Sequence, residues 1–185
     1  MARSSVQRES SAQISPADER FRALFEEGFD YIWNTLRRLG IPPCDLEDVT
    51  HDVLLDVYRK IELYDPVRPL RPWLFAFAFR VASDFRRRAQ RRRESIGEIE
   101  HVDGAPLADE RLASRQDRLL VAAALEKLDL DQRAVFVLHD LDDVAVPEIA
   151  RTLGVPLNTA YSRLRAAREN FVKALRRLQR EESRR

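Results

Sequence analysis

Apolar side chains recur at every third or fourth position through most of the chain, which is the spacing of an amphipathic helix. Between residues 19 and 39 they fall at Phe21, Leu24, Phe25, Phe29, Ile32, Trp33 and Leu36. The pattern resumes at about 46–63 and again at about 72–92. Gly40, Pro42 and Pro43 end the first helix, and proline-containing pairs at 65–66 and 68–69 separate the second from the third. The first half of the chain therefore predicts three helices.

The second half predicts a separate group of shorter helices, at about 116–128, 131–140, 146–153 and 157–179. Between the groups, residues 94–115 are acidic and weakly periodic and contain Gly97, Gly104 and Pro106, which is typical of a linker. Residues 1–18 are polar and aperiodic, which is typical of a disordered tail. The expected fold class is all-α, with two small helical domains at 19–93 and 116–180 joined by a flexible linker at 94–115.

Composition adds a segregation of charge to this picture. Hydrophobic residues make up 44% of the 185 positions and charged residues 34%, a balance that suits charged helices with packed cores. The net charge of +1 conceals seven arginines between positions 80 and 93 and five acidic residues between positions 45 and 56. Such a chain can offer a basic face to one partner and an acidic face to another. The plainer alternative for each run is solvated surface.

The sequence also limits the expected location of the protein. Cys44 is the single cysteine, so no internal disulfide can form, which fits a reducing compartment. The N-terminus lacks the apolar core of a signal peptide, and the longest uncharged aromatic run, at 72–79, is too short to cross a bilayer. We therefore expect a soluble cytoplasmic protein.

The strongest local pattern lies at residues 147–164. A short helix with small Ala150 on its inner side meets a turn at Gly154, and a second helix follows, which predicts a helix-turn-helix. The second helix of such a motif enters the major groove by its N-terminal part. The residues expected to face base edges are Asn158, Tyr161, Ser162 and Arg165, and those expected to contact phosphates are Arg163, Arg168 and Lys173. The alternative is an ordinary helical hairpin with a solvated basic face.

A second pattern is the helix from Trp73 to Arg93, in which four aromatic residues precede the arginine cluster. One side can belong to the core while the other offers rings to unstacked bases and arginines to phosphates. Simple packing is the better interpretation for Trp73 and Phe77, whereas both interpretations stay open for Phe79 and Arg80.

A third pattern is an acidic stripe, formed by Asp48, His51, Asp52 and Asp56 at helical spacings of three and four. A stripe of this charge suits a basic protein partner. His51 with two aspartates could suggest a metal site, but no further His or Cys is placed to complete a coordination shell. The sequence also lacks a phosphate-binding glycine loop and an evident nucleophilic triad. We therefore expect no catalysis, no cofactor and no metal.

Taken together, these segments resemble the extracytoplasmic-function (ECF) sigma factors of the bacterial RNA polymerase sigma-70 family. Region 2 of that family is similar to residues 45–53 and 64–74, and region 4 is similar to residues 124–128, 132–136, 147–164 and 166–169. The resemblance covers roughly 19–93 and 116–178, so both blocks occur in the family's order.

The resemblance implies a sigma factor that binds core RNA polymerase, recognises the minus-35 and minus-10 promoter elements and promotes DNA melting. The acidic stripe would bind the clamp helices of the largest subunit, and region 4 would also contact the flap of the second-largest subunit. The linker would follow the RNA exit path, and an anti-sigma factor is an expected partner. The residues implied for the minus-10 element are Tyr64, Arg71, Trp73, Phe79, Arg80, Arg86 and Arg87. Those implied for the minus-35 element are Asn158, Thr159, Tyr161, Ser162, Arg163, Arg165 and Arg168.

Five positions depart from the family pattern. His51 and Asp52 stand where Gln and Glu are usual, and both can still form hydrogen bonds. Arg80 and Tyr161 replace a common Asn and a common Lys or Arg, so promoter specificity does not transfer from better-known members. Ala145 replaces a Ser or Thr cap, which costs its helix about 1 kcal/mol.

Two other hypotheses follow from the same residues. A stand-alone helix-turn-helix regulator would bind two-fold symmetric operators without polymerase, although it would not need the aromatic and arginine helix. A decoy would keep the fold but not direct initiation, and its motivation is Arg80 and Tyr161. The sigma-factor hypothesis needs two modules that each hold a different stretch of one promoter. A single continuous core that buries the basic faces would contradict it.

Overall fold

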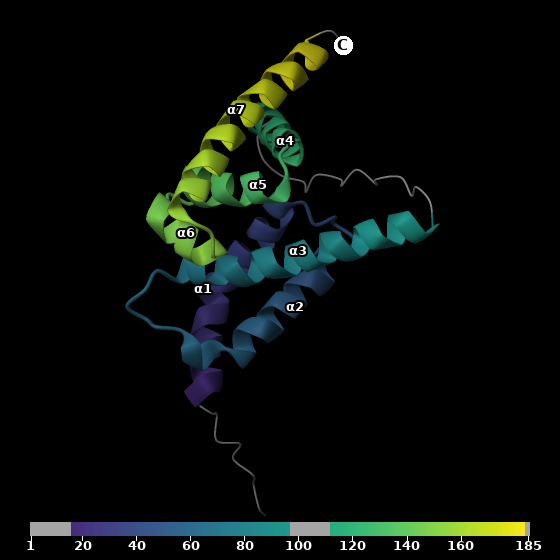
Figure 1. Cartoon of the computed structure of the whole chain (residues 1–185). Helices are drawn as coiled ribbons and strands as arrows, with labels where there is room; N and C mark the ends of the chain where they lie inside the picture. Colours follow the sequence, from purple (N-terminus) through teal and green to yellow (C-terminus); the bar gives the residue numbers. More distant parts are fainter. Residues whose placement is uncertain (1–15, 97–111, 184–185) are drawn as a thin grey trace, which may run out of the picture.

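The computed structural model describes residues 16–96 and 112–183, and every regular element in these ranges is helical (Figure 1). The N-terminal half holds α1 (Pro16–Leu39), α2 (Leu46–Arg59), a short 3-10 turn η1 (Ile61–Leu63) and α3 (Leu70–Ile96). The C-terminal half holds α4 (Leu112–Glu126), α5 (Leu130–Phe136), a π turn η2 (Val137–Leu141), α6 (Val146–Leu153) and α7 (Leu157–Glu182). The all-helical expectation is confirmed.

The element bounds differ from the sequence expectation at the tail and the linker. Helix α1 begins at Pro16, inside the range expected as a tail, while α3 and α4 extend into the two ends of the range expected as a linker. The rest of both predictions falls on residues 1–15 and 97–111, which lie outside the described residues. The single helix expected at 131–140 is instead α5 followed by the π turn η2.

The three long helices of the N-terminal half pack around a common apolar core. Helix α1 lies against α2 and α3, and these two helices also pack on each other. Fully buried side chains from each helix fill the centre, among them Ile32, Val53 and Phe75. Helix α1 ends at Leu39, and the φ of +88° at the following Gly40 lets Ile41 N–H donate to the carbonyl of Leu36 at 3.0 Å. This left-handed glycine is a common way to satisfy the last carbonyls of a helix.

The C-terminal half is organised around α7, which packs against α4, α5 and α6. Asp129 caps α5, because its carboxylate accepts a hydrogen bond from Gln132 N–H at 2.8 Å. Gly154, with φ of +65°, ends α6 and turns the chain into α7. Phe136 stacks on Phe171 with ring centroids 4.6 Å apart, which joins α5 to α7.

The two halves pack directly against each other. Helix α6 lies on α3 and α5 lies on α1, so one apolar cluster runs from α1, α2 and α3 into α5, α6 and α7 (Figure 1). A smaller cluster around Leu125, Leu128 and Ala167 belongs to the C-terminal half alone. The core is therefore continuous between the halves, whereas the expected base-facing side of α7 stays exposed. The sequence did not predict this packing.

Candidate nucleic-acid and polymerase interfaces

Helices α6 and α7 form the helix-turn-helix that the sequence predicts. Ile149 and Ala150 of α6 are buried against Ala160 and Leu164 of α7. Because a helix has 3.6 residues per turn, the opposite side of α7 faces outward. The side chains there are exposed, at Asn158, Tyr161, Ser162 and Arg165. Four of the residues predicted for the minus-35 element thus share one accessible face, whereas Thr159 is half-buried beside it.

The arginines of α7 divide into two kinds. Arg163 forms an ion pair with Asp131 of α5, and Arg168 forms one with Asp140 of η2. The Arg165 side chain is 85% exposed and lies 3.8 Å from Glu169, itself 71% exposed. A surface pair of that kind contributes little to stability. Arg165 therefore resembles a surface group available to a ligand, while Arg163 and Arg168 hold α7 against its neighbours.

The ion pair between Arg168 and Asp140 affects the pKa of the Asp140 carboxyl. Burial alone would raise the pKa of Asp140, but hydrogen bonds and charge from Arg168, together with His139, bring that pKa below its ordinary value. Arg168 Nε lies 3.1 Å from both carboxylate oxygens of Asp140, a geometry that favours the charged form.

The first helix of the motif begins without a side-chain cap. Its N-cap residue is Ala145, with extended backbone at φ −66° and ψ 141°. The carbonyl of Ala145 accepts hydrogen bonds from Glu148 N–H and Ile149 N–H, at 2.9 and 3.1 Å. Ala145 is exposed, so a serine there would have room to accept a further hydrogen bond. The uncapped start predicted from sequence is therefore present.

The loop between η1 and α3 is braced from within. Tyr64 Oη donates to the carbonyl of Arg68 at 3.0 Å, and the Asp65 carboxylate accepts from Val67 N–H at 3.0 Å. The Tyr64 ring lies 4.9 Å from that of Trp73 at the start of α3. Val67 stands at the tip of this turn with 91% of its surface exposed. The loop is thus a pre-formed turn that displays an apolar side chain.

The aromatic residues of α3 divide differently from the sequence expectation, which favoured packing for both Trp73 and Phe77. Phe75 and Phe77 are buried, whereas Trp73 and Phe79 are half-buried and pack against the core from its edge. The Arg80 guanidinium lies 5.8 Å from the centre of the Phe77 ring, in cation–π contact, and is itself exposed. Arg71, before Trp73, is also exposed.

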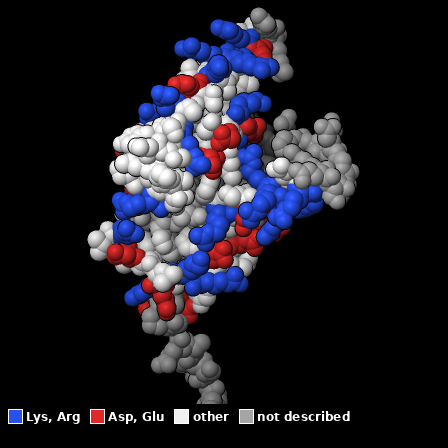
Figure 2. Space-filling view, viewed as in Figure 1, with Lys and Arg blue, Asp and Glu red and all other residues white. Residues whose placement is uncertain are grey.

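Basic side chains continue along the C-terminal half of α3. Arg86 and Arg87 are exposed, as are Arg88, Arg91 and Arg92. In Figure 2 blue side chains gather over this end of α3 and along α7. Arg87 pairs with Asp84 one turn earlier, an exposed pair of small energetic weight. The charge segregation predicted from sequence therefore becomes a basic surface on the folded chain.

The acidic stripe lies on the outer side of α2. Asp48, His51 and Asp52 are exposed, while Asp56 is half-buried and its carboxylate lies 3.5 Å from Arg59. Leu55 falls between these residues and is 40% exposed. The face therefore combines acidic groups with one apolar side chain.

Two exposed apolar residues, Val67 and Leu55, were missed by the sequence analysis. Their position in the sequence could have identified them, because each lies inside a segment that the sequence analysis had already assigned to an interface. An apolar residue within a polar segment is easily taken for core, and exposure becomes visible only in the fold.

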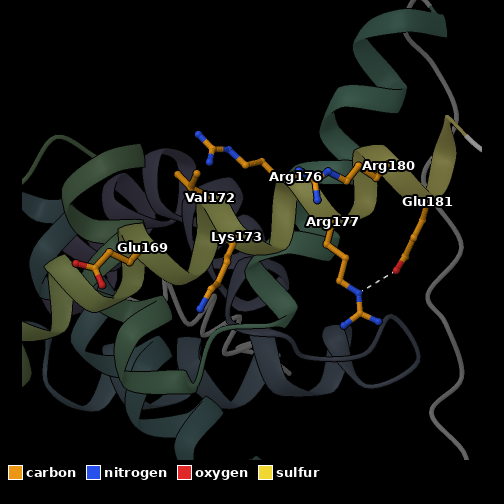
Figure 3. Close-up of a pocket in the computed structure, with 7 residues that line it drawn as sticks. All are labelled: Glu169, Val172, Lys173, Arg176, Arg177, Arg180 and Glu181. Atoms are coloured by element: carbon orange, nitrogen blue, oxygen red, sulfur yellow. Dashed lines mark hydrogen bonds and ion pairs between the residues drawn. The ribbon is translucent and has the colours of Figure 1, made fainter.

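A shallow groove follows the C-terminal half of α7 (Figure 3). Its walls are side chains of α7 itself, including Lys173, Arg176, Arg177 and Arg180. Arg177 Nε donates to Glu181 at 2.9 Å. Since one helix supplies the whole lining, the groove is open charged surface and not an enclosed ligand site.

Over residues 16–96 and 112–183, the structure brings together no group of three or more His, Cys, Asp or Glu residues that could hold a metal ion. Among the helices in the same ranges, none is long and apolar enough to cross a membrane. Separately, the described residues present basic, acidic and apolar surfaces of the kind that bind macromolecules.

Comparison with known families extends these observations. The model of Sigma-70 region 2 matches residues 24–92, and the model of Sigma-70 region 4 matches residues 118–171. RNA polymerase sigma factor CnrH of Cupriavidus metallidurans is 31% identical over 141 residues, which cover 71% of this chain and 74% of the relative. ECF RNA polymerase sigma factor SigL of Mycobacterium tuberculosis is 34% identical over 158 residues, covering 84% of this chain and 86% of the relative.

Solved structures give the same fold. The sigma factor RpoE of Bartonella quintana, in complex with the anti-sigma factor NepR, superposes with a TM-score of 0.71 at 23% identity, over 85% of this chain and 98% of that chain. CnrH in complex with the cytosolic domain of CnrY superposes with a TM-score of 0.60 at 26% identity, over 86% of this chain and 94% of that chain.

The fold and its exposed faces define a helical DNA-binding protein of the helix-turn-helix class. With both regions matched in order, the chain belongs to the ECF sigma factors of the sigma-70 family. It is an RNA polymerase sigma factor that acts in transcription initiation. Sigma factors are non-enzymatic subunits of RNA polymerase, so the protein is not an enzyme.

Proposed function

We propose that this sigma factor binds core RNA polymerase through α2, reads the minus-35 element with α7, and reads and melts the minus-10 element with the Tyr64 loop and α3. The observation that carries the proposal is the exposed face of α7, because it combines Asn158, Tyr161, Ser162 and Arg165 beyond a correctly formed turn. Amide, hydroxyl and guanidinium groups are the usual readers of base edges in the major groove. The core packing of α6 and α7 does not require these side chains to be polar.

At the minus-10 element, the proposal rests on a braced loop next to aromatic and basic side chains. Trp73 and Phe79 offer partly accessible rings, on which unstacked bases can stack. Arg71, Arg80 and the α3 arginines, including Arg86 and Arg87, supply charge for phosphates. We add Val67 to this set, because apolar side chains inserted between base steps unstack them.

For core polymerase, the proposal rests on the outward face of α2. Asp48, His51 and Asp52 are accessible to a basic partner, and Leu55 adds apolar area among them. An interface with an apolar centre and a charged rim is the usual arrangement between proteins. Asp56, half-buried and paired with Arg59, lies at the edge of this face.

The regulatory partner is proposed by likeness. The CnrH and RpoE structures are complexes with CnrY and with the anti-sigma factor NepR, and we propose that this chain also has an anti-sigma partner. We place the sigma factor in the cytoplasm, where core polymerase and promoter DNA are found.

The decisive experiment is run-off transcription with purified core polymerase on a promoter obtained by mapping start sites after overexpression. We expect transcripts only when core and this chain are both present. Asp48→Arg should prevent assembly with core. Asp30→Arg is the matched control, because it reverses an exposed acidic side chain of α1 that is not part of the α2 face.

The outcomes separate the three hypotheses. Lack of binding between the unmodified chain and core polymerase would refute the proposal. Tight binding to a symmetric duplex without polymerase would instead support a stand-alone regulator. Binding to core without initiation would support a decoy.

A further inference from the structure

The exposed side of α7 continues beyond the residues proposed to read the minus-35 element. Arg176 follows Asn158 by about five full turns of the helix, and both side chains are exposed. Lys173 follows Ser162 by about three full turns and is exposed as well. Because a whole number of turns returns to the same side of a helix, one line of exposed side chains runs along α7. Its first part, which we call the reading face, consists of Asn158, Tyr161, Ser162 and Arg165.

The second part of this line is basic. It consists of Lys173, Arg176 and Arg180, which we call the basic stripe, and all three side chains are exposed. Within the described part of the chain, none of the three forms an ion pair. Blue side chains along α7 in Figure 2 reflect this charge. The stripe is therefore positive charge available to a ligand.

The fold gives little reason for these cations. Helix α7 packs against α4, and buried Ala174 lies on the side of α7 opposite to Arg176. Like charges three or four residues apart on a helix repel each other, so the stripe disfavours the helix that carries it. A cation in the last turn gains from the helix dipole, which accounts for Arg180. That effect does not extend to Lys173 and Arg176, so a ligand explains them better than stability does.

Distance along the helix determines which part of a duplex the stripe can reach. Arg176 lies about 16 Å beyond Arg165 at 1.5 Å per residue, whereas the major groove is about 12 Å wide. When Arg165 lies over base edges, Arg176 therefore lies beyond the groove, over the backbone that borders it. Lysine and arginine are common donors to phosphate oxygens. Their long side chains also suit a straight helix that departs from a curved groove.

One acidic residue lies between the reading face and the stripe. The Glu169 carboxylate is 3.8 Å from Arg165 Nε, and both side chains are exposed. This neighbouring positive charge reduces the repulsion between Glu169 and a phosphate. Glu169 therefore does not prevent DNA from following the line from the reading face to the stripe.

The end of α7 is directed away from the residues proposed for the minus-10 element. It lies beside α4, where Gln116 hydrogen-bonds Glu182. In Figure 1 this end of α7 points away from α3, which carries most of the proposed minus-10 residues. The basic stripe is thus farther from α3 than the reading face is. On a promoter, that direction corresponds to the upstream side of the minus-35 element.

We propose that Lys173 and Arg176 bind DNA phosphates immediately upstream of the minus-35 element, and that Arg180 adds positive charge beyond them. The inference rests on the proposed function, because it requires the reading face to lie in the major groove of that element. Phosphate contacts fix the position of a protein on a duplex without reading its sequence. The basic stripe therefore raises promoter affinity and leaves the choice of promoter to the reading face.

An acidic protein is the other kind of partner that a basic stripe fits. Such a partner could also cover Val172, which is exposed among the cations. DNA is favoured because the stripe continues in line from the reading face. A duplex bound by the reading face already lies beside the stripe and leaves little room for a protein there.

Salt-dependent promoter binding by the holoenzyme tests the proposal. Lys173→Gln and Arg176→Gln each remove one charge and keep a long, helix-forming side chain. Arg177→Gln is the matched control, because Arg177 lies about 100° around α7 from Arg176 and donates to Glu181 at 2.9 Å. Figure 3 shows the two arginines projecting from opposite edges of the helix. Each protein would be measured on a mapped promoter and on the same fragment trimmed at the upstream end of its minus-35 element.

We expect Lys173→Gln and Arg176→Gln each to reduce the slope of log affinity against log salt concentration by about 0.9, because one phosphate contact is lost. The same loss weakens promoter binding by about eightfold at about 0.1 M salt. It should be equal on promoters with altered minus-35 bases, since phosphates carry no sequence information. Arg177→Gln should change the affinity by less than about twofold, because salt screens a charge that is not in contact with DNA. On the trimmed fragment, the unmodified protein and both stripe variants should bind equally.

Unchanged salt slopes in both stripe variants would overturn the proposal and leave an acidic protein as the partner of the stripe. An equal loss in Arg177→Gln would overturn it too, because net charge alone would then explain the effect. A loss that persisted on the trimmed fragment would also overturn it. Urea unfolding checks that each variant is folded. Failure of the unmodified holoenzyme to bind the promoter would instead refute the proposed function, so the two failures are distinguishable.

Discussion

Arg165 and Arg168 lie less than one turn apart on α7, yet the structure predicts opposite consequences when each is replaced by alanine. The Arg165 side chain is 85% exposed, and its Nε lies 3.8 Å from the carboxylate of Glu169, which is also exposed to solvent. Arg165→Ala should therefore change the free energy of unfolding by less than about 0.5 kcal/mol. If Arg165 contacts a base edge, the same change should weaken promoter binding by about 1–3 kcal/mol, or roughly 5- to 150-fold.

Arg168 should behave as a structural residue. It hydrogen-bonds both oxygens of Asp140, whose side chain is 22% exposed, and so fastens α7 to η2. Its own side chain is 50% exposed, so solvent screening reduces the expected loss on Arg168→Ala to about 1 kcal/mol of unfolding free energy. The loss should also depend on pH.

The sign of that pH dependence follows from Asp140. Although burial acts in the opposite direction, Arg168 and His139 hold the pKa of Asp140 below its ordinary value. A carboxylate with a lowered pKa stabilises the fold above its unfolded pKa, and this stability is lost as the pH falls through the folded pKa. The difference between the unmodified protein and Arg168→Ala should therefore be full at neutral pH, begin to fall as the pH approaches about 4, the ordinary pKa of an aspartate, and disappear only once the pH is below the lowered folded pKa of Asp140.

Two measurements check this pair. Urea unfolding followed by circular dichroism gives the stability of each variant, and holoenzyme binding to a labelled promoter gives the DNA affinity at fixed salt. The reasoning would be refuted if Arg165→Ala destabilised the fold and left promoter affinity unchanged. Equal losses of affinity in both variants, with equal stabilities, would also refute it.

The remaining predictions concern the helix caps, the loop tip and the first turn. Ala145→Ser should stabilise the protein by about 1 kcal/mol, because the serine caps α6, and Asp129→Ala should destabilise it by a similar amount, because it uncaps α5. Thermal unfolding measures both changes in stability. If both variants changed stability in the same direction, the cap assignment would be contradicted. Val67→Ser should reduce promoter opening by about 1 kcal/mol, roughly fivefold, and a pre-melted template should restore initiation; a defect that persists there would exclude a role in strand separation. Gly40→Ala should cost roughly 1–2 kcal/mol of unfolding free energy, because φ is +88° and Arg133 fills the space beside it; a neutral result in urea unfolding would show that neither constraint matters.

The helices and the motif could be predicted because they depend on local order. Periodic apolar residues identify each helix, and Gly154 with Ala150 identifies the turn and the close crossing of α6 and α7. The exposed face of α7 follows from the same periodicity. These features need no knowledge of which helices meet.

The partners of individual charges could not be predicted in this way. The sequence places Arg163, Arg165 and Arg168 together on a basic helix. Only the fold brings Asp131 next to Arg163 and Asp140 next to Arg168. Residues 28 or more positions apart in sequence form these pairs. Periodicity carries no information about contacts of that kind, so the division into binding and structural arginines appears only in the structure.

The contact between the two regions was hidden for a related reason. Val146 and Ile149 fit the inner face of a helix-turn-helix, so their apolar character was already explained without region 2. Arg133 sits in a segment that resembles region 4, where an arginine suggests surface, yet burial and the nearby charge of Arg86 lower its pKa to about 10. An arginine is seldom buried without good pairing, because the uncompensated charge is costly. The burial of Arg133 beside Gly40 is therefore informative, because the apolar packing that brings α5 onto α1 has to offset the cost of this incompletely paired guanidinium.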